Sequence, residues 1–195
     1  MRKIEFAEVA PLIEYERMRE GYRRRIIDLK RRRRVQVGDH LSFLFENRET
    51  VLFQIQEMLR AERIVEEARV RDEIDVYNDL IPGEGELSAT LFIEIEDPAL
   101  IKETLDRLMG IDVGERVWIE IGGAHVIPGI FEAGHSDEER GKLSAVHFVR
   151  FRFGPAEIRG FREDDAFLVA DHPGARARVR IPDEVKASLL QDLGA

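Results

Sequence analysis

Apolar residues recur every three or four positions in two long segments of the first half of the chain, a spacing that predicts amphipathic helices. The first helix is expected to begin near Pro11 and to end by Arg34, and its stripe comprises Tyr15, Met18, Tyr22, Ile26 and Leu29. The second is expected after Asn47, a favourable N-cap residue, and its stripe comprises Val51, Leu52, Ile55, Met58 and Leu59. After a bend, a weaker stripe continues through Val65, Val70, Ile74 and Tyr77.

Alternation of apolar and polar residues predicts strands. A β-hairpin is expected to turn at Gly38 and Asp39, and it places Leu41, Phe43 and Phe45 on one strand face. Further strands are expected at residues 87–95, 117–121, 126–131, 143–153, 167–170 and 177–181. One helix is expected from Asp97 and Pro98 to Gly110, and a last one after Pro182.

These elements predict an α+β protein. Long N-terminal helices and a β-hairpin are expected to pack with a mostly antiparallel sheet or open barrel, because at most one helical segment separates any two of the later strands. The break at Pro82, Gly83 and Gly85 favours a boundary between a helical part with the hairpin, residues 1–82, and an α+β sheet part, residues 83–195. One continuous domain remains the alternative, since 195 residues fit either arrangement.

Composition narrows the classes of function. The chain has no cysteine, which excludes disulfides, thiolate metal sites and thiol catalysis. No stretch has the apolar length of a membrane-spanning helix, and the first residues lack the apolar run of a signal peptide. With 44% hydrophobic and 35% charged residues, the sequence predicts a globular protein of a bacterial cytoplasm, with no membrane partner.

Charge is unevenly distributed along the chain. A basic run begins at Arg23 and ends at Arg34 with a local charge of +7. Because the net charge of the whole chain is −9, the rest of the chain carries −16. An exposed run of this kind would favour nucleic-acid binding. The acidic segment of residues 62–79 offers an internal partner instead, and the run lacks interleaved aromatic residues for stacking on single strands. We therefore expect the run to be neutralised mainly inside the protein or its oligomer.

Arginines alternate along two of the predicted strands. Because strand side chains alternate between faces, two neighbouring strands of this kind would form one cationic face for phosphate or carboxylate, made of Arg150, Arg152, Arg176, Arg178 and Arg180. The favoured alternative is an ordinary solvated face or pairing with acids. Either way, acidic side chains or a bound anion should lie within reach of at least two of these guanidinium groups.

The junction between the hairpin and the second helix is rich in polar side chains. Glu46 and Glu57 could act as acid and base there, with Arg48 as an electrophile. A helix cap with a solvated flank explains the same residues, and the spacing does not decide between the two interpretations.

Signals for metals and cofactors are weak. The five histidines are scattered, so no metal site is predicted, and no cofactor is identified. His147 has apolar neighbours, which favours a hydrogen-bonded core histidine over a general base. One loop could hold a weak cation, although a solvated loop is the favoured interpretation; it contains His135, Asp137, Glu138 and Glu139.

Four segments resemble the bacterial family known as domain of unknown function 3501: YERMR, LFENRETVLFQIQEMLRAERI, YNDLIPGEGELSATLFIEI and SAVHFVRFRF. The likeness covers nearly the whole chain, and the second segment is the most specific. The resemblance carries no activity, cofactor or catalytic residue. It implies a link to redox or oxidative-stress functions, because members are encoded beside rubrerythrin-like and iron–sulfur proteins. Without cysteine or paired iron ligands, this chain is not expected to be the redox centre itself.

Three hypotheses for function follow. The leading one is a non-catalytic accessory protein that binds a protein partner or a small anion. The alternatives are an enzyme that uses the corner of Glu46, Arg48 and Glu57, and a protein that binds nucleic acid through the basic run. Self-association as a homodimer is also expected, because Phe53 and Ile64 are apolar and lie away from the main helical stripe.

Overall fold

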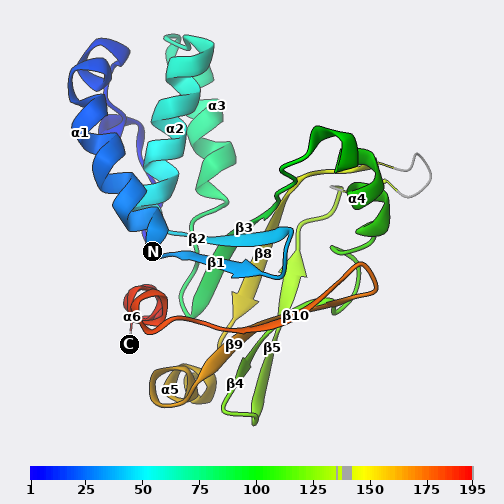
Figure 1. Cartoon of the computed structure of the whole chain (residues 1–195). Coiled ribbons are helices and arrows are strands. Elements are labelled where there is room, and N and C mark those ends of the chain that lie inside the picture. The colour runs from blue at the N-terminus through cyan, green and yellow to red at the C-terminus, as the bar shows by residue number, and fades with distance from the viewer. Residues whose placement is uncertain (135, 138–141, 195) are drawn as a thin grey trace.

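The structure, a computed structural model, describes residues 1–134, 136–137 and 142–194. It consists of a layer of three long helices set against a strongly curved sheet, with shorter helices at the ends of the sheet (Figure 1). The predicted α+β class, with N-terminal helices and a hairpin packed on an antiparallel open barrel, is confirmed.

The helical layer comprises α1 (Leu12–Arg31), α2 (Arg48–Glu62) and α3 (Glu67–Asn78), which stand side by side in Figure 1. Helix α2 begins as predicted, because the Asn47 side chain accepts hydrogen bonds from the backbone N–H groups of Glu49 and Thr50, both at 3.0 Å. The expected bend is a complete break. Arg63 adopts a left-handed conformation with φ of 54° and ends α2.

Eight strands form one sheet in the order β1-β2-β3-β8-β5-β4-β9-β10, and every pairing is antiparallel. The strands are β1 (Arg34–Val37), β2 (Leu41–Glu46), β3 (Glu86–Ile93), β8 (Val146–Arg152), β5 (His125–Phe131), β4 (Val117–Ile121), β9 (Ala166–His172) and β10 (Ala175–Arg180). Strand β1 also contacts β9 and β10, so the sheet nearly closes into a barrel. The hairpin of residues 1–82 and the strands of residues 83–195 therefore share one sheet.

Short elements complete the chain. They are η1 (Phe6–Glu8), η2 (Pro98–Leu100), α4 (Ile101–Arg107), β6 (Ser136–Asp137), β7 (Lys142–Leu143), α5 (Pro155–Glu163) and α6 (Asp183–Asp192). Helix α5 was not predicted from the sequence. Gly160 interrupts its pattern, and it has only one fully buried apolar residue, Phe161, so its apolar periodicity is short.

The main core lies inside the barrel. Alternate residues of β2 point inward, as predicted, and Leu41, Phe43 and Phe45 are fully buried. The Phe45 and Phe151 rings meet there with centroids 6.1 Å apart. Gly129 of β5 is required for this packing, because a Cβ atom would lie 2.9 Å from Val149 and 3.0 Å from a backbone oxygen.

Part of the outer face of the sheet is buried as well. The helical layer covers the outward residues of β2 and β3, so that Leu44, Glu46, Ser88 and Thr90 are at most 8% exposed. Residues on both faces of β2 are therefore buried, although most antiparallel strands have one solvated face. This buried outer face, between the helices and the sheet, contains the polar residues Glu46, Ser88 and Thr90.

Candidate functional site

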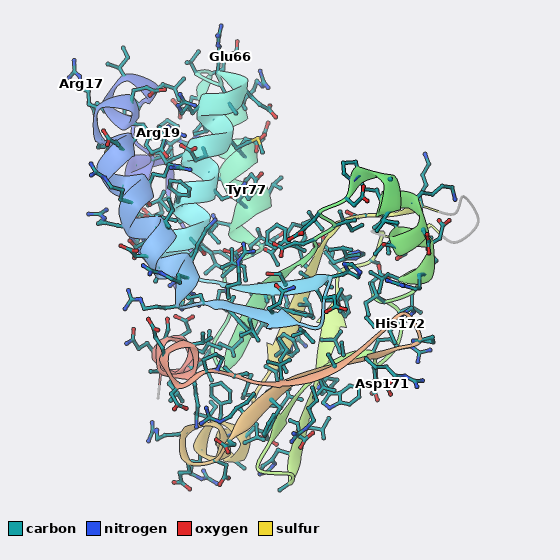
Figure 2. All side chains as sticks on the ribbon, in the orientation of Figure 1. Arg17, Arg19, Glu66, Tyr77, Asp171 and His172 are labelled. Carbon is teal, nitrogen blue, oxygen red and sulfur yellow. The ribbon has the colours of Figure 1, made fainter. Side chains whose placement is uncertain are left out.

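A cavity of about 270 Å³ lies between the helical layer and the outer face of the sheet. Helices α1, α2 and α3 form one side, and strands β2, β3 and β8 form the other. Tyr77, one of the lining residues, is labelled in Figure 2 on the part of α3 nearer to the sheet. The lining residues are Lys30, Leu44, Glu46, Val51, Gln54, Tyr77, Leu80, Thr90, Phe92, Val146 and Phe148.

Glu46 is the acidic residue of this lining. It is the last residue of β2 and is 8% exposed. Its carboxylate accepts a hydrogen bond from the Thr50 hydroxyl at 2.5 Å and another from the Thr90 hydroxyl at 2.7 Å. Thr50 belongs to the first turn of α2 and Thr90 to β3, so the carboxylate links the two layers.

Both donors to Glu46 are neutral hydroxyl groups, and the carboxylate forms no ion pair with any other described residue. A carboxylate offers about four acceptor positions, and two hydroxyl groups leave some of them available. Burying a carboxylate is unfavourable unless a cation or several donors compensate for the lost water. Glu46 is therefore a buried acceptor with unused capacity at the wall of a cavity.

Arg33 fixes the backbone at Glu46 rather than its carboxylate. Its guanidinium is 1% exposed and donates to the carbonyl oxygen of Phe45 at 2.8 Å and to that of Glu46 at 3.1 Å. The same group donates to Ser188 at 3.0 Å and forms an ion pair with Asp192, both in α6. Burial raises the pKa of Asp192, and Arg33 opposes that effect. The end of β2 is thus held rigidly.

Lys30 is the basic residue of the cavity lining. It lies in the last turn of α1, and its ammonium group is 5.6 Å from the centre of the Phe53 ring. Among the described residues, no carboxylate forms an ion pair with Lys30. Lys30 and Glu46 therefore line one cavity with opposite charges and without an ion pair between them.

The remaining walls are mostly apolar. Phe92 and Phe148 contribute aromatic surface from β3 and β8, and Leu44 and Val146 contribute aliphatic surface. Burial raises the pKa of Tyr77, while a hydrogen bond with Gln54 works in the opposite direction. The phenol therefore stays neutral at physiological pH, as a polar group in the lining of the cavity.

A second hollow of about 270 Å³ adjoins the first, since both include Leu80 and Phe148 in their lining. Its charged groups are already engaged. The Arg150 guanidinium forms an ion pair with Glu86 and donates to the carbonyl oxygen of Asp79. Burial acts to raise the pKa of Glu86, but the Gly83 N–H and Arg150 lower it overall.

The hypothesis of one cationic face was wrong in its geometry. Strand β8 carries Arg150 and Arg152, β10 carries Arg176, Arg178 and Arg180, and three strands, β5, β4 and β9, separate them. Every one of these arginines pairs with a carboxylate: Glu86 for the first two, then Asp171 for Arg176, Glu120 for Arg178 and both Asp165 and Asp183 for Arg180. The expected acidic partners are present, and they occupy the donors that a bound anion would need.

The structure does not bring Glu46, Arg48 and Glu57 together. Arg48 donates to Glu8 at 2.5 Å and to the Arg2 carbonyl oxygen at 3.1 Å. Glu57 faces α1 and accepts from Arg19. The three side chains have separate partners, and only Glu46 lines the cavity, so their positions do not support a shared acid–base site.

Glu57 belongs to the contact between α1 and α2. It accepts two hydrogen bonds from Arg19, both at 2.7 Å, and one from the buried Tyr15 hydroxyl at 2.6 Å. Arg19 and the Tyr15 hydroxyl hold the pKa of Glu57 below its usual value, against the effect of burial. Burial and the bond to Glu57 raise the pKa of Tyr15. This cluster ties the two helices together.

The basic run finds partners, but not in the acidic helix. Ion pairs from the run reach Glu20, Asp28, Glu94, Glu184 and Asp192. The acidic segment around α3 instead pairs with Lys3, Arg69 and Arg71. The expected partner was therefore wrong, because α2 lies between α1 and α3.

His147 matches the core interpretation. It is 0% exposed, its Nε2 atom lies 2.8 Å from the Ser144 carbonyl oxygen, and its Nδ1 atom lies 3.4 Å from an Asp112 carboxylate oxygen. No cluster of metal-binding side chains occurs among the described residues. The loop considered for a weak cation lies outside them: His135, Glu138, Glu139 and the side chain of Asp137.

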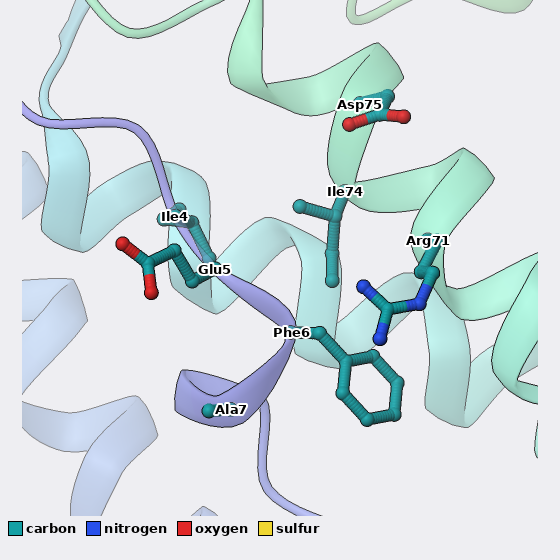
Figure 3. A pocket seen from close by; sticks show the side chains of 7 residues that line it. All are labelled: Ile4, Glu5, Phe6, Ala7, Arg71, Ile74 and Asp75. Carbon is teal, nitrogen blue, oxygen red and sulfur yellow. The ribbon is translucent and has the colours of Figure 1, made fainter.

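A hollow of about 440 Å³ between the N-terminal segment and α3 is larger than the cavity at Glu46 (Figure 3). Figure 3 shows the Arg71 guanidinium between Phe6 and Ile74, and it lies 4.5 Å from the centre of the Phe6 ring. Arg71 also pairs with Glu67 at 2.7 Å. Since its cation is already paired and its acids are exposed, this hollow is a weaker candidate.

Sequence reasoning identified Glu46 but missed Lys30, Thr90 and Tyr77 as its neighbours. One signal was present: three of the four outward positions of β3, Glu86, Ser88 and Thr90, are polar residues that tolerate either solvent or a covering layer, and the fourth is Phe92. The helices that cover this face come from earlier in the chain. Only the packing of these helices on the sheet shows that the polar residues of β3 are covered and do not face solvent.

In the described part of the chain, no helix is both long and apolar enough to span a membrane.

Comparisons with known proteins agree with the sequence resemblance. A model of the family described as "Protein of unknown function (DUF3501)" matches residues 3–193. A crystal structure of a novel protein of unknown function from Burkholderia pseudomallei K96243 is 34% identical, with a TM-score of 0.90 over 98% of this chain and 100% of that one. No curated protein matches. The chain belongs to the DUF3501 family of proteins of unknown function.

Proposed function

We propose that this protein is a non-catalytic binding protein, and that its ligand is a small molecule held in the cavity between the helical layer and the sheet. One observation carries the proposal: Glu46 presents a buried carboxylate to that cavity, and its described donors are only two threonine hydroxyl groups. A ligand with N–H donors would compensate for the burial of this charge.

The form of the cavity supports a ligand rather than a packing defect. Binding sites for small molecules combine mostly apolar walls with a few convergent polar groups. Here Phe92 and Phe148 supply apolar surface, and Glu46, Thr90 and Gln54 supply polar atoms. A volume of about 270 Å³ is near the lower limit of such sites, about 300–1,000 Å³, so the ligand should be smaller than a nucleotide.

Binding without catalysis is the better interpretation of the same residues. General acid–base chemistry needs two groups that reach the same substrate. Arg48 and Glu57 point to other partners, and the described lining of the cavity contains one carboxylate.

We further propose that the protein has an accessory role in redox or oxidative-stress functions, which the family resemblance implies. We also include a bacterial cytoplasmic location, which suits a chain without cysteine.

The test is equilibrium dialysis of the purified protein against a bacterial metabolite extract, with detection by mass spectrometry. Val146→Trp would fill the cavity from β8, whereas Val126→Trp makes the same change at a position that is 64% exposed on β5. We expect the wild-type protein and V126W to enrich the same small molecule and V146W to lose it. Equal enrichment by both variants, or no enrichment by the wild-type protein, would contradict the proposal.

A further inference from the structure

We propose that the ligand of this cavity is a zwitterion of the amino-acid type, with its ammonium group on Glu46, its carboxylate on Lys30 and an apolar body between them. This inference rests on the function proposed above and adds the chemical class of the ligand. It starts from the two opposite charges that line one cavity without an ion pair to each other.

The ammonium end is set by Glu46. Its carboxylate is 8% exposed and accepts only from neutral hydroxyl groups among the described residues. A protonated amine offers several N–H donors and a positive charge, and charge-assisted hydrogen bonds are about twice as strong as neutral ones. An anionic ligand near Glu46 would be repelled, so a simple anion does not fit this end.

The carboxylate end is set by Lys30. Its ammonium group has three donors, and its one described interaction is with the face of the Phe53 ring at 5.6 Å. A ligand carboxylate would accept from these donors. The other nearby cation is already engaged: the Arg34 guanidinium pairs with Glu94 at 2.7 Å, donates to Ser42 at 3.1 Å and lies 5.4 Å from the Phe92 ring centre.

The middle of the ligand is set by the apolar walls. Leu44, Phe92, Val146 and Phe148 line the same cavity as the two charged groups and favour aliphatic or aromatic surface. The volume of about 270 Å³ admits a molecule of amino-acid size. Phosphorylated ligands are disfavoured, because the arginines further along β8, Arg150 and Arg152, are paired with Glu86.

The test measures binding of single compounds by isothermal titration calorimetry. The probes are the apolar α-amino acids and a series of unbranched ω-amino acids, which vary the distance between the two charges. For each compound that binds, the amine without the carboxylate and the acid without the amine are measured as well; for phenylalanine these are 2-phenylethylamine and 3-phenylpropanoate.

We expect at least one amino acid to bind, and both of its single-charge analogues to bind between about tenfold and a hundredfold more weakly. Glu46→Gln should weaken the amino acid and its amine and leave the acid unchanged. Lys30→Met should weaken the amino acid and its acid and leave the amine unchanged. The controls are the exposed Glu103→Gln and Lys102→Met on α4, away from the cavity, which should change none of these affinities.

Two results would overturn the inference. One is that no amino acid binds at millimolar concentration. The other is that the amine alone binds as tightly as the amino acid and K30M changes nothing. In either case the dialysis experiment reports separately on the proposed function, because a different small molecule lost by V146W would keep the cavity as a binding site. If dialysis also finds no ligand, both proposals fail.

Discussion

Glu46→Gln provides a test of the ligand-binding account through stability, without any ligand. The substitution keeps the size and shape of the side chain and removes its negative charge. A protein that keeps a buried carboxylate for a ligand should be less stable without the ligand than its neutral variant. If the carboxylate were instead a structural anchor, the substitution would destabilise the fold.

The magnitude follows from the contacts of Glu46. The two threonine hydroxyl groups donate to different carboxylate oxygens, and an amide keeps only one of these acceptors, so in E46Q one bond is weakened and the other must reverse, with the amide N–H donating to the hydroxyl oxygen. Hydrogen bonds to a charged group contribute about 1.5–3 kcal/mol and neutral ones about 0.5–1.5 kcal/mol, so these changes cost about 2 kcal/mol in total. Against this, burying an ion costs several kcal/mol even after relaxation. At 8% exposure, with no ion pair to a described residue, the second effect is larger. We expect E46Q to stabilise the ligand-free protein by about 1 kcal/mol or more.

Urea denaturation of ligand-free protein at neutral pH measures this difference. In a thermal denaturation experiment on a chain of this size, the same 1 kcal/mol would appear as a rise in Tm of about 2–4 °C. Glu94→Gln is the matched control, because the Glu94 side chain is 45% exposed and its loss should change stability by at most about 0.5 kcal/mol. Destabilisation of E46Q by more than about 1 kcal/mol would refute the reasoning, since the carboxylate would then be a net structural contact.

Four further predictions concern the rest of the molecule. Arg33→Met should lower the free energy of unfolding by about 3–5 kcal/mol, because it leaves a buried carboxylate unpaired, whereas Arg32→Met at an exposed position should have little effect; urea denaturation compares them. Arg19 holds the pKa of Glu57 below 4.5, so the stability from this pair is present above pH 4.5 and is lost as the pH falls through the lowered pKa. The stability difference between the wild-type protein and Glu57→Gln should therefore shrink towards zero on acidification, and a constant difference would contradict this. Binding to duplex or single-stranded DNA and to RNA should be weak across a salt series, because much of the basic run is paired internally; tight binding that falls steeply with salt would show otherwise. Sedimentation at micromolar concentration should give a dimer mass. Ile64, one basis for that expectation, is buried at 2% exposure and Phe53 packs against Tyr22, but large exposed apolar residues such as Ile13 remain on the helical layer; a monomer mass would count against the prediction.

Local patterns predicted most of the fold. The three-to-four residue spacing gave the helices, and the turn at Gly38 and Asp39 gave the hairpin, since these signals act within a few residues of the chain. Strand order was not accessible in the same way. The pairing of β8 with β3 and β5, rather than with the strand that carries Arg176, Arg178 and Arg180, depends on contacts far apart in sequence.

The candidate site was predicted only in part. Glu46 was identified from the polar corner where β2 meets α2, but Arg48 and Glu57 were assigned to the same site in error. Glu57 lies nine residues after Arg48 in α2, about two and a half helical turns, so the two side chains leave opposite sides of the helix. Glu57 therefore faces α1, whereas Arg48 faces the N-terminal segment. Lys30 and Thr90 join Glu46 from other elements, so only the tertiary arrangement brings them into one cavity.

The most direct test of the cavity as the ligand site is a methyl NMR spectrum. Protein with isotope-labelled leucine, valine and threonine methyl groups would be recorded before and after addition of the bacterial metabolite extract. We predict shifts concentrated at Leu44, Val51, Thr90 and Val146, which line the cavity, and their loss in E46Q. Unchanged cavity methyl groups, or shifts confined to exposed positions such as Val126, would contradict the account.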